Sequence, residues 1–206
     1  MDSLSFTDRE FLILYKRFYG TRYPGDTSIP SSEDNISSMT PPHVRGEKLG
    51  YILDLCQLSI GSYSYTWNYH GPYSPGLLAQ LRELDGKQDE INSFYDQDLP
   101  DSIIFTNDRN PQSLFWADDQ QRIDKLLDDL ALPKDEREAG EKMELLGSLA
   151  YISLNVIPGA PYEEVVEELI ARKPKYAAEG MAPKIGVAWE AFQKLNPLGI
   201  YSFYNT

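Results

Sequence analysis

Cysteine and histidine are scarce in this sequence, which has one cysteine, Cys56, and two histidines, His43 and His70. A single cysteine cannot form an intramolecular disulfide or a cysteine-based zinc site. The zinc-binding pattern His-Glu-x-x-His is also absent. Cys56 falls on the apolar side of an expected helix, which indicates a buried and unreactive thiol. We therefore expect no disulfide, no metal and no cofactor.

Several motifs that define enzyme classes are also missing. The sequence has no Gly-x-x-x-x-Gly-Lys-Ser/Thr loop, no Gly-x-Gly-x-x-Gly loop and no Gly-x-Ser-x-Gly elbow. No apolar run approaches the roughly 18 residues of a transmembrane helix. The N-terminal residues have no basic segment followed by an apolar stretch, so no signal peptide is indicated. We expect a cytoplasmic protein that does not bind membranes.

Basic residues are outnumbered, with 19 Lys and Arg against 32 Asp and Glu, which gives a formal net charge of −13. Nucleic-acid binding depends on clustered Lys and Arg, so this charge argues against a nucleic-acid partner. It is typical of a soluble surface, and it also suits a partner protein with a basic face. Acidic pairs on expected helices, such as Asp118-Asp119, indicate solvated helix faces.

The 206 residues, 41% of them hydrophobic, are enough for one domain with a real core, residues 1–206. Expected helices, each with apolar residues three or four positions apart, cover about 7–19, 42–60, 75–84, 112–131, 135–155, 162–172 and 182–195. Residues 91–95 are compatible with a further short helix, and residues 21–42 have the composition of a long, mobile loop. The expected class is mainly α, a compact bundle of six or seven helices with a strand near 62–69.

Aromatic residues recur at every second position in the segment Tyr63-Ser-Tyr-Thr-Trp-Asn-Tyr69. This spacing is typical of a strand and places the four rings on one face. The polar residues between them indicate that the other face is wet, so we expect most of the rings to lie in the core. The alternative is an exposed recognition surface, in which Tyr and Trp act as rigid anchors. Tyr73, beyond the turn at Gly71-Pro72, is the better surface candidate.

Three further features lie in or near this segment. Ser74-Pro75 is typical of a helix start, with serine as the N-cap and proline at the first helical position. His70 is either a general base, with Ser64 or Ser74 as a nucleophile, or a residue that satisfies the turn by hydrogen bonding. Lys173-Pro-Lys175 is a small basic spot, which we expect to neutralise a helix C-terminus rather than to bind phosphate.

Part of this pattern resembles the core of the SocA-like, or Panacea, antitoxin domains. The matching residues are Lys48-Leu49, Tyr51, Trp67, Tyr69, Gly71-Pro72 and Pro75. The chain departs from that pattern by the insertion of His70 and by Tyr73-Ser74, which bring it closer to the bacterial YwgA-like proteins. Segments 144–150, 162–170 and 173–176 are also similar to that group. The resemblance implies binding to partner toxins or an adaptor role in proteolysis, and it implies no catalytic residue.

The leading hypothesis is a non-enzymatic protein-interaction module, antitoxin-like or defence-associated. Its partner would be a toxin or defence component with a basic face, and the predicted contact residues are Trp67, Tyr69, His70, Gly71, Pro72, Tyr73 and Ser74. A small-molecule or nucleotide-processing enzyme centred on His70 is the alternative. An acidic nucleic-acid mimic over residues 85–144 is weaker, because basic residues interrupt that run. The apolar tail and the 14 tyrosines are compatible with a homodimer.

Overall fold

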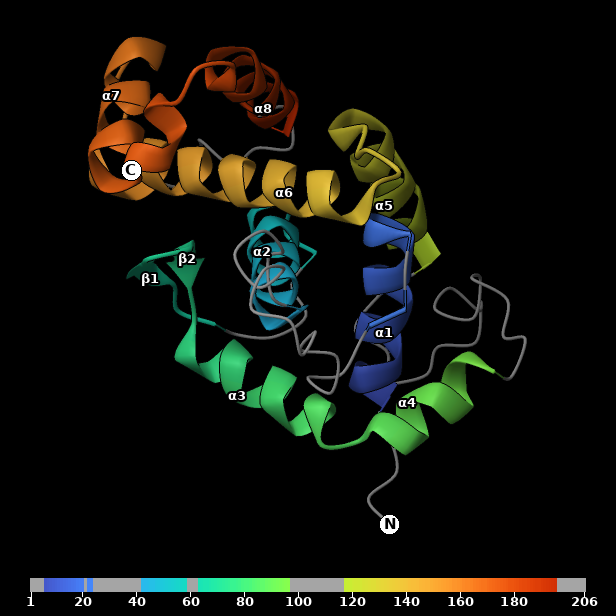
Figure 1. Ribbon diagram of the computed structural model, residues 1–206. Helices are drawn as coiled ribbons and strands as arrows, with labels where there is room; N and C mark the ends of the chain where they lie inside the picture. Colours follow the sequence, from blue (N-terminus) through green and yellow to red (C-terminus); the bar gives the residue numbers. More distant parts are fainter. Residues whose placement is uncertain (1–5, 21, 24–41, 59–62, 97–116, 196–206) are drawn as a thin grey trace.

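The computed structural model describes residues 6–20, 22–23, 42–58, 63–96 and 117–195. Over these residues the chain forms eight α-helices and one two-stranded antiparallel sheet (Figure 1). The elements are α1 (Phe6–Tyr19), α2 (Pro42–Leu55), β1 (Thr66–Asn68), β2 (Gly71–Tyr73), α3 (Pro75–Asp85), α4 (Gln88–Tyr95), α5 (Ala117–Leu130), α6 (Glu136–Tyr151), α7 (Tyr162–Arg172) and α8 (Met181–Leu195). A π-helical turn, η2 (Ile152–Val156), extends α6, and a 3-10 turn, η3 (Pro174–Ala177), follows α7. The expected mainly α class with a small β element is confirmed.

Helix α6 is the central element of the fold. It packs against α8, α2, β2, α7 and α1, and in Figure 1 it runs across the middle, with α7 and α8 on one side and α1 and α2 on the other. Every residue from Met143 to Ala150 is buried, because helices and the sheet cover this stretch all round. Small residues allow that close approach: a Cβ at Gly147 would lie 3.4 Å from the Pro72 ring and 3.6 Å from the Lys48 side chain.

The apolar core divides into two clusters on either side of α6. The larger cluster joins α1 to α6 with the end of α8, and the smaller cluster joins α6 to α7, η3 and the start of α8. Tyrosine contributes unusually large buried side chains to both clusters, namely Tyr15, Tyr19, Tyr23 and Tyr176. A buried arginine links three helices of the larger cluster. Arg45 donates a 2.7 Å hydrogen bond to the Tyr15 hydroxyl and forms an ion pair with Glu136.

A local sequence signal accounts for the start of α3, whereas α2 and α4 differ from the expected bounds. Ser74 is the N-cap of α3, its hydroxyl accepts from the Leu77 N–H, and Pro75 begins the helix, as predicted. Helix α2 is shorter than expected, because it ends at Leu55 and Gln57 adopts a left-handed backbone at φ 55°. In its described part, the structure has one helix more than the seven expected, because α4 forms at Gln88–Tyr95, where residues 91–95 were compatible with a further short helix.

The expected strand near 62–69 is also shorter, since β1 covers only Thr66–Asn68. Gly71-Pro72 does not end the β structure but begins the second strand, which pairs with β1 in the register Thr66 with Tyr73. The physical reason is the lack of a partner: β2 stops at Tyr73 because Ser74 caps α3, so the residues before Thr66 have no strand beside them. Tyr63 and Tyr65 nevertheless pack on the larger core cluster.

Several predictions fall on residues that the structure does not describe, or describes only in part. They are the loop at 21–42, the end of the second helix near 60, the acidic run 85–144, the start of the helix expected from 112, and the apolar tail after Gly199. In the described part of the chain, no helix is long and apolar enough to cross a membrane.

Candidate functional site

The β1–β2 hairpin carries most of the residues that the sequence predicted as a binding site. Tyr69 and His70 form its turn, and the Asn68 side-chain oxygen accepts a 2.9 Å hydrogen bond from the His70 N–H. A short polar side chain that closes a turn in this way reproduces a backbone hydrogen bond. The Asn68 side chain and the His70 backbone make this bond, so the expectation that His70 itself satisfies the turn stays a prediction.

Gly71 lets the hairpin lie directly on α6. Its φ of +92° favours glycine, and a Cβ there would lie only 2.5 Å from the Ser148 hydroxyl and 3.4 Å from the Lys173 ammonium. Ser148 itself is fully buried, and its hydroxyl has no hydrogen-bond partner among the described residues. The backbone of the hairpin thus contacts α6 at Gly71, where there is no room for a side chain.

Lys48 of α2 also holds the hairpin. Its side chain is completely buried and donates a hydrogen bond to the carbonyl oxygen of Pro72. Burial lowers the pKa of Lys48 well below that of a free lysine, although the carboxylate of Glu47 opposes this effect. Burial likewise raises the pKa of Glu47, and Lys48 opposes it. The amine of Lys48 therefore supports β2 from a buried position, where Glu47 and Glu144 only partly offset the effect of burial on its pKa.

A buried ion pair lies close to Lys48, between Glu144 of α6 and the residues that follow α7. Glu144 is 5% exposed, and one of its oxygens accepts from the ammonium groups of Lys173 at 2.7 Å and Lys175 at 2.8 Å and from the Tyr176 hydroxyl at 3.3 Å. Burial alone would raise the pKa of Glu144, but Lys173 and then Lys175 reverse this effect and hold it at about 2. Burial lowers the pKa of Lys173 to about 8 against the opposing charge of Glu144.

The basic spot at Lys173-Pro-Lys175 has a partner that the sequence did not identify. Lys173 is the residue after the end of α7, where we expected a cation, and its ammonium is buried and bound to Glu144. Nothing in the local sequence predicted that partner, because Glu144 precedes Lys173 by 29 residues.

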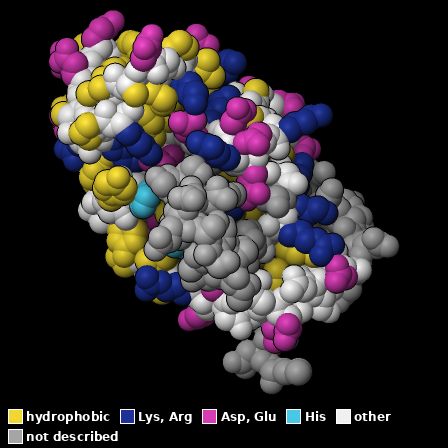
Figure 2. All heavy atoms as spheres, viewed as in Figure 1, with side chains coloured by type: hydrophobic (Ala, Val, Ile, Leu, Met, Phe, Trp, Pro, Cys, Tyr) yellow, Lys and Arg dark blue, Asp and Glu magenta, His cyan; other side chains and the backbone are white. Residues whose placement is uncertain are grey.

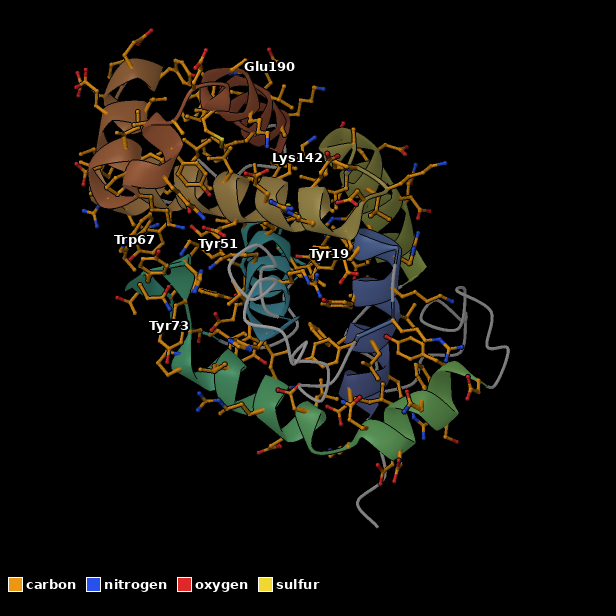
Figure 3. The ribbon with its side chains drawn as sticks, in the orientation of Figure 1. Tyr19, Tyr51, Trp67, Tyr73, Lys142 and Glu190 are labelled. Carbon is orange, nitrogen blue, oxygen red and sulfur yellow. The ribbon has the colours of Figure 1, made fainter. Side chains whose placement is uncertain are left out.

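Aromatic rings connect the hairpin to the helices. The Trp67 ring contacts Tyr151 of α6, with ring centroids 5.8 Å apart, and Tyr51 of α2 bridges Tyr151 and Tyr65. Two cations flank Trp67: Arg172 lies 5.1 Å from the ring centroid and Lys173 lies 5.6 Å from it. Figure 3 shows Trp67 on the hairpin facing the lower end of α7, with Tyr51 beneath α6. The expectation that most rings of the aromatic row pack on the core is confirmed for Tyr63, Tyr65 and Trp67.

Tyr69 is the exception, and it is the most exposed large hydrophobic residue described. Its side chain is 83% exposed at the tip of the turn, and its ring meets His70 edge to face at 5.0 Å. His70 is half-buried rather than exposed, and burial lowers the pKa of its imidazole. Tyr73, which the sequence favoured as the surface residue, is only half-exposed where β2 leads into α3 (Figure 3). The tip of the hairpin, and not its base, is therefore the exposed part.

The seven predicted contact residues thus have two structural roles. Gly71, Pro72 and Ser74 are buried and hold the hairpin and the start of α3 in place. Trp67, Tyr69, His70 and Tyr73 keep surface that a partner or ligand can reach. In the described residues no group of three or more His, Cys, Asp and Glu side chains lies close enough to hold a metal ion.

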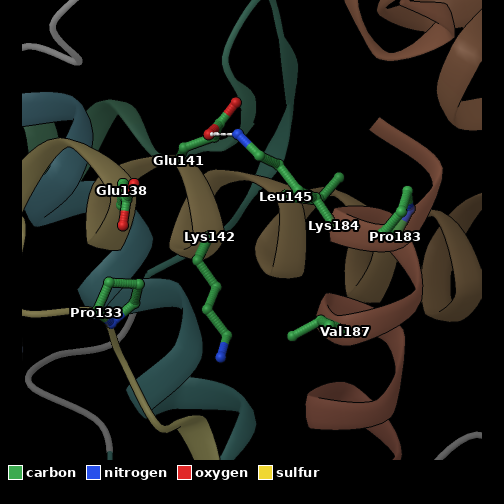
Figure 4. Close-up of a pocket in the computed structure, with 8 residues that line it drawn as sticks. All are labelled: Pro133, Glu138, Glu141, Lys142, Leu145, Pro183, Lys184 and Val187. Atoms are coloured by element: carbon green, nitrogen blue, oxygen red, sulfur yellow. Dashed lines mark hydrogen bonds and ion pairs between the residues drawn. The ribbon is translucent and has the colours of Figure 1, made fainter. Parts of the chain in front are cut away.

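A separate groove of about 310 Å³ lies between α6 and α8 (Figure 4). It is lined by Pro133, Glu138, Glu141, Lys142, Leu145, Pro183, Lys184 and Val187. An ion pair of 2.6 Å between Lys184 and Glu141 crosses its rim, and Val187 is 51% exposed. None of the predicted site residues lines this groove, so it is independent of the hairpin.

Comparisons of the chain with models of protein families, with curated protein sequences and with solved structures found no match.

Proposed function

We propose that this chain is a non-enzymatic protein-interaction module whose β1–β2 hairpin contacts a partner protein. The observation that carries the proposal is the exposure of Tyr69, 83%, at the tip of a hairpin that is otherwise anchored in the core. Tyrosine is among the residues that contribute most at protein interfaces, because it buries a large rigid ring and keeps a polar tip.

The support beneath the hairpin strengthens the argument. Lys48 donates to the Pro72 carbonyl, and Gly71 lies against Ser148. The Trp67 ring contacts Tyr151 and two cations. A contact surface that is already ordered loses little conformational entropy on binding, so more of its interaction energy appears as affinity. Burying the amines of Lys48 and Lys173 costs free energy, because each loses its contact with water. Their presence favours a hairpin whose shape matters for binding.

The finer class that we propose is antitoxin-like or defence-associated, acting in the cytoplasm. Its support is the resemblance of Lys48-Leu49, Trp67, Tyr69 and Gly71-Pro72 to the SocA-like pattern. These residues are also the ones that build and anchor the hairpin. The net charge of −13 adds a long-range preference for a partner with a basic face, which would raise the association rate more than the affinity.

Capture of the partner from the native host tests this proposal. The tagged full chain, its Tyr69→Ala variant and a Val187→Ala control are each used as bait, and bound proteins are identified by mass spectrometry. Val187 is the matched control because it is the other exposed large hydrophobic residue described and lies on α8 in the separate groove. We expect one stoichiometric partner with wild type and with Val187→Ala, lost with Tyr69→Ala. Equal capture by all three baits would overturn the role of the hairpin.

A small-molecule enzyme centred on His70 remains the second candidate, and one observation favours it. His70 lies beside Lys48, Lys173 and Glu144, which all have shifted pKa values, and such clusters occur at active sites. A metabolite screen separates the two functions. Turnover that is lost in His70→Ala but kept in Tyr69→Ala would establish an enzyme.

A further inference from the structure

We propose that the surface between the hairpin and the end of α7 binds an acidic peptide segment of the partner, with carboxylates at Lys175 and Arg172 and an apolar side chain against Tyr69. This inference rests on the proposed function and names the chemistry of the segment that the hairpin contacts. The charges that matter here are those of Lys175 and Arg172, in direct contact with the carboxylates of the bound peptide. The net charge of −13, in contrast, acts on the partner as a whole during approach.

The first step is the local excess of positive charge. Lys173 and Lys175 share a single oxygen of Glu144, so two ammonium groups face one carboxylate. Arg172 has a carboxylate of its own, since it pairs with Glu168 at 2.5 Å. Lys48 and Glu47 of α2 are one base and one acid, so they do not remove this excess. The whole chain has 13 more acidic than basic residues, whereas the bases outnumber the acids in this cluster around Glu144.

The second step is that the excess charge reaches the surface. The Lys175 side chain is 54% exposed even though its ammonium binds Glu144, whereas Lys173 is buried. Arg172 is exposed at the last residue of α7, with its guanidinium over the Trp67 ring. A carboxylate of a bound peptide can therefore meet Lys175 or Arg172 without displacing any core residue.

The third step is that the cations and the exposed ring belong to one surface. Arg172 and Lys173 lie over the Trp67 ring, and Lys173 also lies next to Gly71. Tyr69 contacts His70 edge to face in the same turn. Lys173 and Lys175 bind the same oxygen of Glu144, and the Lys173 ammonium would lie 3.4 Å from a Cβ at Gly71, next to the turn. In Figure 2, basic and hydrophobic side chains gather along the left edge, between α7 and the hairpin. Aromatic residues beside arginine are typical of the energetic centre of an interface.

Selection from a random peptide library on the immobilised full chain tests the inference. Enriched peptides are synthesised with a fluorescent label, and their dissociation constants are measured by anisotropy at two salt concentrations. We expect an Asp or Glu next to a large apolar residue, and about fivefold weaker binding for each carboxylate replaced by its amide. Higher salt should weaken the binding of the acidic peptide more than that of its amide form.

The matched variants are Lys175→Gln, Lys175→Glu and the control Lys184→Glu. Lys175 and Lys184 are alike in exposure, 54% and 53%, and both pair with a carboxylate of α6. We expect Lys175→Gln to weaken the acidic peptide several-fold and Lys175→Glu to weaken it more than tenfold, while Lys184→Glu leaves it unchanged. Circular dichroism melting of each variant verifies that the fold is intact, and Lys175→Gln avoids a new carboxylate beside Glu144.

The outcomes separate this inference from the proposed function. Peptides that require Tyr69 but show no acidic preference, or that bind Lys175→Glu as well as wild type, would overturn the inference and leave the interaction module standing. A screen without any peptide that depends on Tyr69 would overturn both. Binding of a polyanion such as heparin equal to that of the peptides would also overturn it, because the surface would then read charge alone.

Discussion

Replacing Glu144 by glutamine removes the carboxylate that Lys173 and Lys175 share. The amide keeps the shape of the side chain and can still accept a hydrogen bond, but it leaves the buried ammonium of Lys173 without an opposite charge. Breaking a buried ion pair by removing one partner destabilises proteins by about 3 to 5 kcal/mol. We therefore expect the free energy of unfolding of Glu144→Gln to fall by an amount in that range.

The pKa of Glu144 leads to the same magnitude. It lies at about 2 in the folded chain against an ordinary value of 4.5, because Lys173 and Lys175 outweigh the effect of burial. Each pKa unit corresponds to about 1.4 kcal/mol, so the carboxylate contributes about 3 kcal/mol to stability at neutral pH. In the variant Lys173 can also lose its proton, since its pKa is already about 8 with Glu144 present. This loss of charge limits the cost, and we expect a value nearer 3 than 5 kcal/mol.

Urea unfolding at pH 7, followed by circular dichroism, measures this difference. The control is Glu141→Gln, which removes an α6 carboxylate from the exposed pair with Lys184, with side chains 37% and 53% exposed. Exposed pairs contribute at most about 1 kcal/mol, so the control should remain close to wild type. Losses that differ by less than about 1 kcal/mol between Glu144→Gln and Glu141→Gln would refute the reasoning. Adding Lys173→Met to Glu144→Gln should recover part of the loss, because no buried charge then remains unpaired.

The same carboxylate gives a pH dependence with a definite sign. The folded pKa of Glu144 is depressed, so its contribution is complete above pH 4.5 and is lost as the pH falls toward 2. Lys173 acts at the other end: its folded form releases a proton near pH 8 and its unfolded form near 10.5, so it makes stability rise with pH in that window. We expect Glu144→Gln to have a shallower acid limb than wild type between pH 4.5 and 2 in the same urea assay.

Three further predictions concern the support of the hairpin and the core. Gly71→Ala should destabilise the chain by about 3 kcal/mol, from backbone strain at φ +92° plus the clash with Ser148, whereas Gly180→Ala, at φ +84° in open space, should lose only about 1 kcal/mol in urea unfolding. Ser148→Ala should be neutral or slightly stabilising by the same measurement, since its buried hydroxyl has no described partner, and a loss of more than 1 kcal/mol would contradict this. Cys56 is fully buried and burial raises its pKa to about 12, so its thiol should react with a disulfide reagent only at the rate of unfolding, which stopped-flow absorbance with and without urea would reveal.

Much of the helical fold was predictable because its signals are local. Apolar residues three and four positions apart identified the helices, and Ser74-Pro75 marked the start of α3 correctly. The apolar position of Cys56 likewise predicted its burial. The alternation of aromatic and polar residues from Tyr63 to Trp67 indicated which face is covered, and the structure has that pattern. It did not indicate how long the strand is, because strand length depends on a partner that Ser74 cuts short.

The candidate site was predicted as a segment but not as an arrangement. The sequence singled out residues 67–74, yet it favoured Tyr73 over Tyr69 as the surface residue and treated Lys173 as a helix-end charge. Exposure at the tip depends on how the hairpin lies against α6, which is decided by the contact between Gly71 and Ser148. The ion pair depends on α6 and the residue after α7 meeting across the fold.

The chain by itself therefore determined its helices, its capped turn into α3 and the polar and apolar faces of its elements. These properties follow from hydrogen bonds and side-chain periods within about one or two turns of the backbone. The tertiary structure alone decided that Lys48, Glu144 and Lys173 meet beneath the hairpin and that Tyr69 is its exposed ring. Lys48 is 24 residues from Pro72, whose carbonyl it binds, and Lys173 is 29 residues from Glu144. Only the packing around α6 brings these groups together and removes them from water, so that the loss of one partner leaves a buried charge unpaired.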